Sequence, residues 1–228
     1  MKGIGSHMSL EKRRLIHSVI FPLFFLFVIF CIKLIEELEH LRFTELGVKP
    51  LCAEGVLGIF TSPLVHGDWG HLYSNSVSLL VLGVALFYFY NKIAYKVFIL
   101  IYLLSGLGTW LAARDLWHIG ASGVIYGLAG FLALSGIIRR HLRLIAISFI
   151  VIFFYGSLVW GALPLKFNLP YSWEGHFWGG LVGLILAVVY RREGPQRPKS
   201  PFDFEDEEGE GDSEDGEVPY WMKTDVEP

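Results

Sequence analysis

The chain has few charged residues and almost no cysteine. Asp, Glu, Lys and Arg make up 18% of its 228 residues, hydrophobic residues make up 53%, and the mean hydropathy is +0.48. This composition excludes an ordinary soluble domain. The two cysteines, Cys31 and Cys52, provide neither a disulfide framework nor the spacing of a zinc site. We therefore expect each to be a packed or free thiol.

Long apolar runs are what the chain has instead. Runs of about 17 to 25 apolar residues can cross the hydrocarbon of a bilayer as helices, whereas barrel strands would alternate in polarity. Five long runs and a shorter, glycine-rich sixth are present: Leu15–Ile35, Leu72–Tyr90, Tyr95–Ala113, Ser122–Ile138, Leu142–Leu163 and Gly175–Tyr190. The sequence thus predicts an all-α polytopic membrane protein, a six-transmembrane-helix bundle formed by one domain over residues 9–195.

The basic residues between the runs predict the orientation of the bundle. Cytoplasmic loops carry an excess of Lys and Arg, and through six spans the count is 13 on one side against 5 on the other. The larger set is Lys2, Lys12, Arg13, Arg14, Lys92, Lys96, Arg139, Arg140, Arg143, Arg191, Arg192, Arg197 and Lys199; the smaller is Lys33, Arg42, Lys49, Arg114 and Lys166. Both termini are therefore expected in the cytoplasm. The first run is too long for a removable signal peptide and should remain as a helix.

The two ends of the chain differ from the domain between them. Residues 203–217 carry ten acidic and no basic residues, so we expect residues 196–228 to form a disordered acidic cytoplasmic tail. Its aromatic end, Val218–Met222, is either a short docking motif or a plain terminus. Gly5–Met8 resembles an expression-vector scar, so residues 1–8 are expected to have no part in the function.

Three polar clusters fall at the same predicted depth. With the amino terminus inside, every even-numbered span begins near the outer face: His71 and Asn75 start the second, Ser122 the fourth and His176 the sixth. Ionisable groups within a membrane are costly and usually mark a functional site. A serine nucleophile, a histidine base and nearby hydrogen-bond donors are the parts of an acyl-transfer site.

The setting of Ser122 suits this chemistry. The first N–H groups of a helix lack intrahelical partners and the dipole is positive there, so a developing oxyanion would be stabilised. Gly120 and Gly123 allow a turn and a close approach. Asn75 lies four residues after His71, so both side chains project from one helix face.

Each cluster also has a simpler interpretation. Gly-x-Ser-Gly, His71 with Asn75, and His176 with Gly179 and Gly183 each occur as helix-packing or hydrogen-bonding elements between membrane helices. His66, Asp68 and His71 could be three metal ligands on a loop, but an interfacial loop with Asp68 as a helix start and Trp69 as an anchor is the favoured interpretation. The sequence has no His-Glu-x-x-His motif and no pair of intramembrane aspartates. No metal, no cofactor and no nucleic-acid partner is expected.

Together the clusters resemble a rhomboid intramembrane serine protease of the basic six-span bacterial type. The resemblance covers about residues 15–190 and rests on three motifs: Gly120-Ala121-Ser122-Gly123, His71-x-x-x-Asn75 and Gly175-His176-x-x-Gly179-x-x-x-Gly183. It implies a rhomboid-like bundle in the bacterial inner membrane with its active site toward the outer face. It also implies a Ser122–His176 dyad, an oxyanion hole made by Ser122 N–H, His71 and Asn75, and Tyr126 packed against the histidine. The supporting glycines are Gly120, Gly123, Gly179 and Gly183.

The implied partners are the lipid bilayer and single-span or multi-span membrane proteins. These membrane proteins are the implied substrates, which are cut within their transmembrane segments through an acyl-enzyme. An alternative is an inactive relative that binds membrane proteins in quality control. Many family members carry a Trp-Arg pair in the first outer loop, but residues 36–70 contain Leu41-Arg42-Phe43 and Trp69. How this loop is fixed, the oligomeric state and the substrate are therefore left open. Gly175 replaces a common alanine, which should be tolerated. The resemblance further implies that Lys166–Trp173 caps the site.

Overall fold

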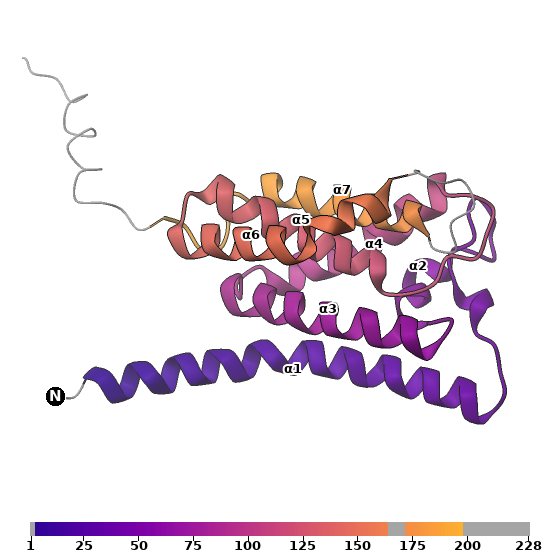
Figure 1. The fold of residues 1–228 in the computed structure, drawn as a ribbon, viewed down its shortest axis with the longest axis horizontal. Helices are drawn as coiled ribbons and strands as arrows, with labels where there is room; N and C mark the ends of the chain where they lie inside the picture. Colours follow the sequence, from indigo (N-terminus) through magenta and orange to yellow (C-terminus); the bar gives the residue numbers. More distant parts are fainter. Residues whose placement is uncertain (1–2, 164–171, 198–228) are drawn as a thin grey trace, which may run out of the picture. The chain divides into compact units, whose positions relative to one another are not determined.

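A computed structural model describes residues 3–163 and 172–197, with side chains from residue 10 onward (Figure 1). Residues 164–171 and 198–228 are not described, so most of the predicted cap (166–171) and the predicted acidic tail beyond residue 197 lie outside the described residues. The described chain is helical, and its β-type pairing is one bridge between Val48 and His118. The elements are α1 (Gly3–Leu38), η1 (Thr44–Leu46), α2 (Gly58–Thr61), η2 (Ser62–Leu64), α3 (Trp69–Phe89), α4 (Ala94–Ala112), α5 (Ser122–Arg139), α6 (Leu142–Tyr155), η3 (Gly156–Ala162) and α7 (Trp173–Val189).

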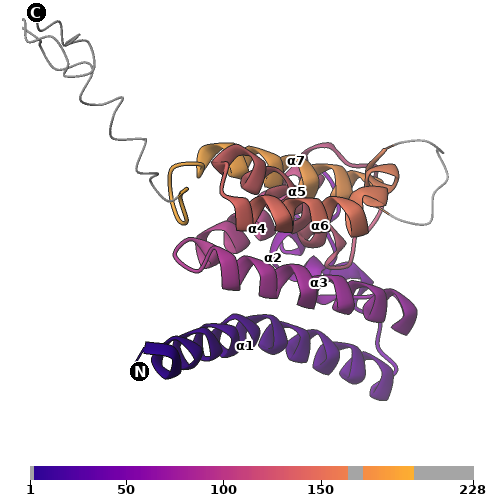
Figure 2. The same cartoon turned by 60° about the vertical axis from the view of Figure 1, so that its left-hand side comes forward.

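The predicted all-α polytopic architecture is confirmed. Five segments are long and apolar enough to cross a membrane, namely the greater part of α1, the whole of α3, α4 and α5, and α6 together with η3. The apolar helix α7 has 17 residues. The helices lie side by side, with α1 on the outside against α3 (Figures 1 and 2). Helix α5 contacts α3, α4, α6 and α7, so the helix that begins with Ser122 is central in the bundle.

Glycines allow α5 and α7 to pack with their backbones in contact. A Cβ added at Gly179 would lie 1.9 Å from the carbonyl oxygen of Gly123, and one at Gly183 would lie 2.0 Å from that of Gly127. Small residues are what permit such approach between membrane helices, where dispersion contacts replace the hydrophobic effect. This packing fixes the separation of the two helices that carry Ser122 and His176.

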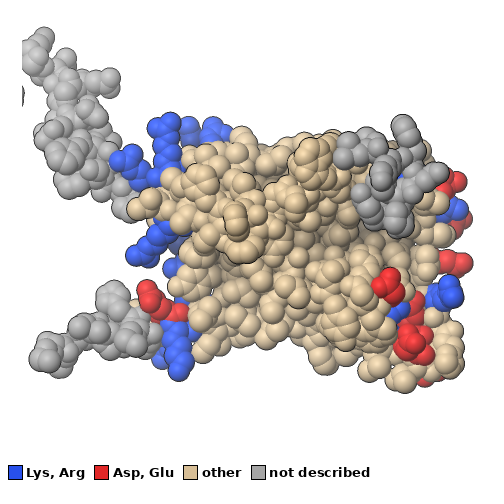
Figure 3. Space-filling model, in the orientation of Figure 1, with Lys and Arg blue, Asp and Glu red and all other residues tan. Residues whose placement is uncertain are grey.

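Charges separate toward the two ends of the bundle. Among the described residues on the face shown in Figure 3, Lys and Arg gather mainly at the end where α1 begins, whereas Asp and Glu lie mainly at the opposite end. At the basic end, the buried Arg139 donates hydrogen bonds to Ser135 Oγ at 2.9 Å and to the Pro195 carbonyl at 3.0 Å. This arginine therefore ties the end of α5 to the segment after α7.

The loop between α1 and α3 is fixed by contacts other than a Trp-Arg pair. Trp110 Nε1 donates to the Cys52 carbonyl at 3.0 Å, which joins the loop to α4. The buried Lys33 pairs with Glu36 at 2.7 Å, and Glu36 in turn accepts from the backbone N–H of Phe43 at 3.0 Å. Lys33 also donates to the Gly67 carbonyl at 3.2 Å. An ion pair on α1 thus holds both ends of this loop.

Candidate active site

Ser122 is the first residue of α5 and follows a sharply turned segment. Gly120 has φ +106°, a left-handed conformation that side chains disfavour. Its N–H donates to the Ser62 carbonyl at 2.9 Å, and the next N–H, of Ala121, donates to His66 Nε2 at 3.4 Å. Two neighbouring elements therefore hold the turn that presents Ser122 at a helix amino terminus.

His176 lies in the first turns of α7, beside Ser122. Its Nε2 is 2.8 Å from Ser122 Oγ, and its Nδ1 is 3.0 Å from the carbonyl oxygen of Gly161. A carbonyl only accepts, so the Nδ1 position carries the imidazole proton and Nε2 is left to accept the hydroxyl proton of Ser122. This is the tautomer that a general base toward Ser122 requires.

Tyr126 fixes the plane of the histidine ring. It lies one turn after Ser122, and its ring stacks on that of His176 with centroids 4.2 Å apart and planes 8° apart. The stacked ring and the Gly161 carbonyl together restrain both the tilt and the rotation of the imidazole. Gly161, in η3, is a site residue that no sequence motif marks.

His71 and Asn75 approach the same turn from α3. Asp68 caps this helix, as predicted, by accepting from the N–H of His71 at 2.8 Å. A Cβ added at Gly120 would lie 2.7 Å from His71 Cε1 and 3.6 Å from Asn75 Nδ2, so both side chains border Gly120. Within the described part of the chain, the buried Nδ2 of Asn75 has no hydrogen-bond partner. It is a donor available to a bound oxygen.

The side chains of Ser122, His176, Tyr126, His71 and Asn75 line one cavity of about 700 Å³. The cavity also carries several hydroxyl groups, so it provides polar surface between apolar helices. Its polar and aromatic lining includes Asp68, His71, Ser74, Asn75, Ser78, Trp117, Ser122, Tyr126, Ser157, Ser172 and His176. The side chains of His71, Asn75, Ser122 and His176, from three helices, therefore line one cavity.

His66 supports the turn before Ser122 and was considered in the sequence only as a metal ligand. It is 1% exposed, and its ring meets that of His71 edge-on at 5.1 Å. Burial, with a smaller effect of His71, lowers the pKa of His66 to about 4, so the ring is neutral and can accept from Ala121. No three His, Cys, Asp or Glu residues in the described ranges are grouped to hold a metal ion.

Comparison with known proteins agrees with the motifs. The family model described as Rhomboid domain matches residues 53–193. The uncharacterized protein Rv1337 of Mycobacterium tuberculosis is 34% identical over 180 residues, which cover 76% of this chain and 74% of that protein. The uncharacterized protein ML1171 of Mycobacterium leprae is 30% identical over 181 residues, covering 76% and 70%. The chain belongs to the rhomboid family.

Proposed function

We propose that this chain is an intramembrane serine endopeptidase that works through a Ser122–His176 dyad. The observation that carries the proposal is the 2.8 Å approach of His176 Nε2 to Ser122 Oγ, with the opposite ring nitrogen held by the Gly161 carbonyl. Because the Gly161 carbonyl orients the ring, no third acidic residue is required for this tautomer.

The reaction follows from these positions. Ser122 Oγ attacks the carbonyl carbon of a substrate peptide bond while its proton passes to His176 Nε2. The negative oxygen of the tetrahedral intermediate receives hydrogen bonds from the Ser122 N–H and from the side chains of His71 and Asn75. His176 then gives the proton to the leaving nitrogen, which leaves an acyl-enzyme. A water molecule in the cavity hydrolyses the ester, again with His176 as base.

The position of the site supports cleavage near the outer face of the membrane. Helices α3, α5 and α7 all begin at the end of the bundle opposite the basic residues, and the reactive side chains lie near these beginnings. With the basic end in the cytoplasm, both termini lie there too. The mycobacterial relatives favour a bacterial inner membrane. Substrates are membrane proteins whose transmembrane helices unwind readily at Gly or Pro, because an intact helix shields its peptide bonds.

A fluorophosphonate probe, which phosphonylates activated serines, tests the proposal on the purified full chain in detergent. We expect labelling at Ser122, lost in Ser122→Ala and in His176→Ala. Ser157→Ala is the matched control, because Ser157 lines the same cavity, and it should label like wild type. A folded wild-type protein that takes up no probe at Ser122 would instead favour the inactive, scaffold-type relative.

A further inference from the structure

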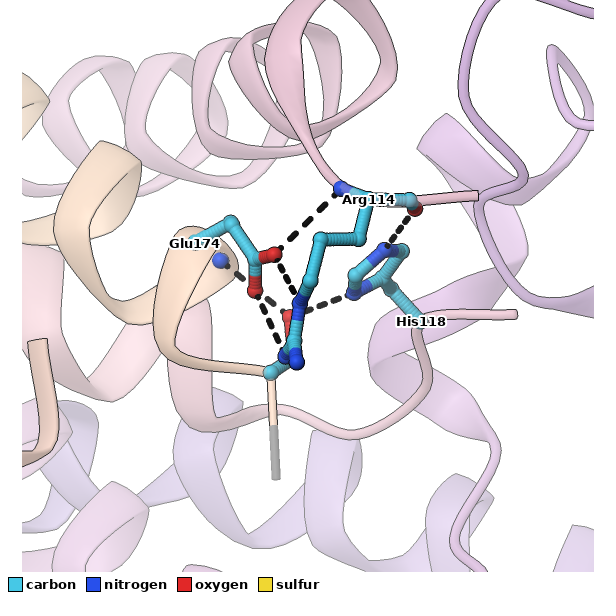
Figure 4. A network of polar contacts seen from close by, with 5 residues as sticks. Arg114, His118 and Glu174 are labelled. Atoms are coloured by element: carbon cyan, nitrogen blue, oxygen red, sulfur yellow. Dashed lines mark hydrogen bonds and ion pairs between the residues drawn. The ribbon is translucent and has the colours of Figure 1, made fainter. Parts of the chain in front are cut away.

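A second polar cluster lies beside the active site and has no role in the proposed reaction. It consists of Arg114, His118, Ser172 and Glu174, here called the α7 clasp. Figure 4 shows the Arg114 guanidinium facing the Glu174 carboxylate, with His118 on the other side of Arg114. Two of these residues belong to the segment that leads into Ser122, and two belong to the start of α7. The clasp therefore joins the two stretches of chain that carry the proposed dyad.

The ion pair of the clasp is bidentate and largely buried. The Glu174 side chain is 3% exposed and that of Arg114 31%. Arg114 Nε pairs with Glu174 Oε1 and Nη2 with Oε2 at 3.2 Å, while the Arg114 backbone N–H also donates to Oε1 at 3.3 Å. A carboxylate held by two side-chain donors and one backbone donor is fixed in both distance and orientation. The first turn of α7 is fixed with it.

His118 and Ser172 form the second contact of the clasp. His118 Nε2 donates to the Arg114 carbonyl at 2.9 Å, because that oxygen only accepts. His118 Nδ1 is thus free to accept from the hydroxyl of Ser172 at 2.6 Å, and Ser172 Oγ itself accepts from the N–H of Gly175 at 3.2 Å. The backbone of His118 also pairs with that of Val48 in both directions, at 2.8 and 2.9 Å. The start of α7 is thereby connected to the loop between α1 and α3.

The clasp restrains the rotation of the first turn of α7, which the glycine contacts between α5 and α7 do not fix. The contacts of Gly179 with Gly123 and of Gly183 with Gly127 set the separation of α5 and α7, but both lie beyond the first turn of α7 and leave the rotation of that turn to other contacts. Glu174 lies two residues before His176 in that turn, and Arg114 lies eight residues before Ser122. We propose that Arg114 and Glu174 are a positioning pair, which holds His176 in hydrogen-bonding register with Ser122. This inference rests on the proposed function.

The rate of fluorophosphonate labelling separates positioning from mere stability. Glu174→Gln keeps the size of the side chain but removes its charge, and a displacement near 1 Å at a reacting group costs about 100-fold in rate. We expect its labelling rate constant to fall about 10- to 100-fold, while the final labelled fraction of the total protein equals that of wild type. A purely structural role would lower the labelled fraction and leave the rate constant unchanged.

Further variants complete the test. Arg114→Lys keeps the charge without the two-pronged geometry, so its rate should lie between those of wild type and Glu174→Gln. The control is Asp115→Asn, because Asp115 neighbours Arg114, is 83% exposed and pairs only at 4.0 Å with Lys49; its rate should be that of wild type.

A wild-type labelling rate constant in Glu174→Gln would overturn the positioning role of Arg114 and Glu174 but not the proposed function. If Glu174→Gln does not fold, a wild-type rate in Arg114→Lys would do the same. A wild-type protein that is not labelled at all would overturn the proposed function, and this inference with it.

Discussion

Replacing Gly179 by alanine should disturb the dyad through the helix packing alone. A Cβ at this position would lie 1.9 Å from the Gly123 carbonyl oxygen, about 1.5 Å short of the 3.4 Å at which ordinary contact begins. Both atoms belong to or are fixed by helix backbones, so α5 and α7 must separate or slide. If this shift of about 1.5 Å fell wholly along the line between His176 Nε2 and Ser122 Oγ, the distance between these atoms would rise from 2.8 Å to about 4.3 Å. That is well beyond hydrogen-bond reach.

The expected result of Gly179→Ala is a fall of about 100-fold in the rate of fluorophosphonate labelling, since a 1 Å misplacement has an effect of that order. Overpacking should also lower the free energy of unfolding by about 1 to 3 kcal/mol. The neighbouring Gly180 is the matched control, because among the described residues no atom outside its own helix turn lies within 4 Å of a Cβ built there. Gly180→Ala should label like wild type and melt no lower. Equal labelling rates in the two variants would refute the packing argument.

Three further changes test the oxyanion hole, the buried His66 and the membrane topology. Asn75→Ala or His71→Ala should each lower the rate of peptide cleavage about 10- to 1,000-fold, because other oxyanion donors remain, and an unchanged rate would remove the residue from that role. Burial lowers the pKa of His66 to about 4, so the unfolded chain takes up a proton below its ordinary value of about 6.5 while the folded chain does not. Stability should therefore fall by about 3 kcal/mol from pH 6.5 to 4, and fall less in His66→Gln; parallel melting curves against pH would contradict this. In a background without the native cysteines, Asp115→Cys should react with an impermeant thiol reagent from outside and Arg143→Cys only from inside, and the reverse pattern would invert the topology.

The sequence was sufficient to predict the long helices and the meeting of the polar clusters at one end of the bundle. The fourth apolar run, Ser122–Ile138, differs by one residue from α5, because hydrophobic length sets a membrane helix directly. The sixth run was predicted to begin at Gly175, but α7 begins at Trp173. The reason is that the buried, paired Glu174 interrupts the apolar pattern without interrupting the helix.

Contacts between distant backbone groups and side chains could not be predicted in this way. His176 is oriented by the carbonyl of Gly161, and His66 accepts from the N–H of Ala121. Glycine and alanine have no reactive side chain, so nothing in the sequence marks these two backbone groups. The pairing of Arg114 with Glu174 spans 60 positions, and no periodicity connects them. Such contacts depend on how the helices pack, whereas the motifs depend on residue type and spacing.

Mapping the cut in a model single-span substrate, whose transmembrane helix contains Gly and Pro, is the direct test of cleavage by the Ser122–His176 dyad. Purified wild-type protein should cut it at one defined bond near the outer end of the helix, as seen by mass spectrometry of the products. Ser122→Ala, His176→Ala and the double variant should lose turnover to about the same extent, because the two residues act as a unit. Retention of the same cut by Ser122→Ala, after a contaminating protease has been excluded, would contradict the serine mechanism.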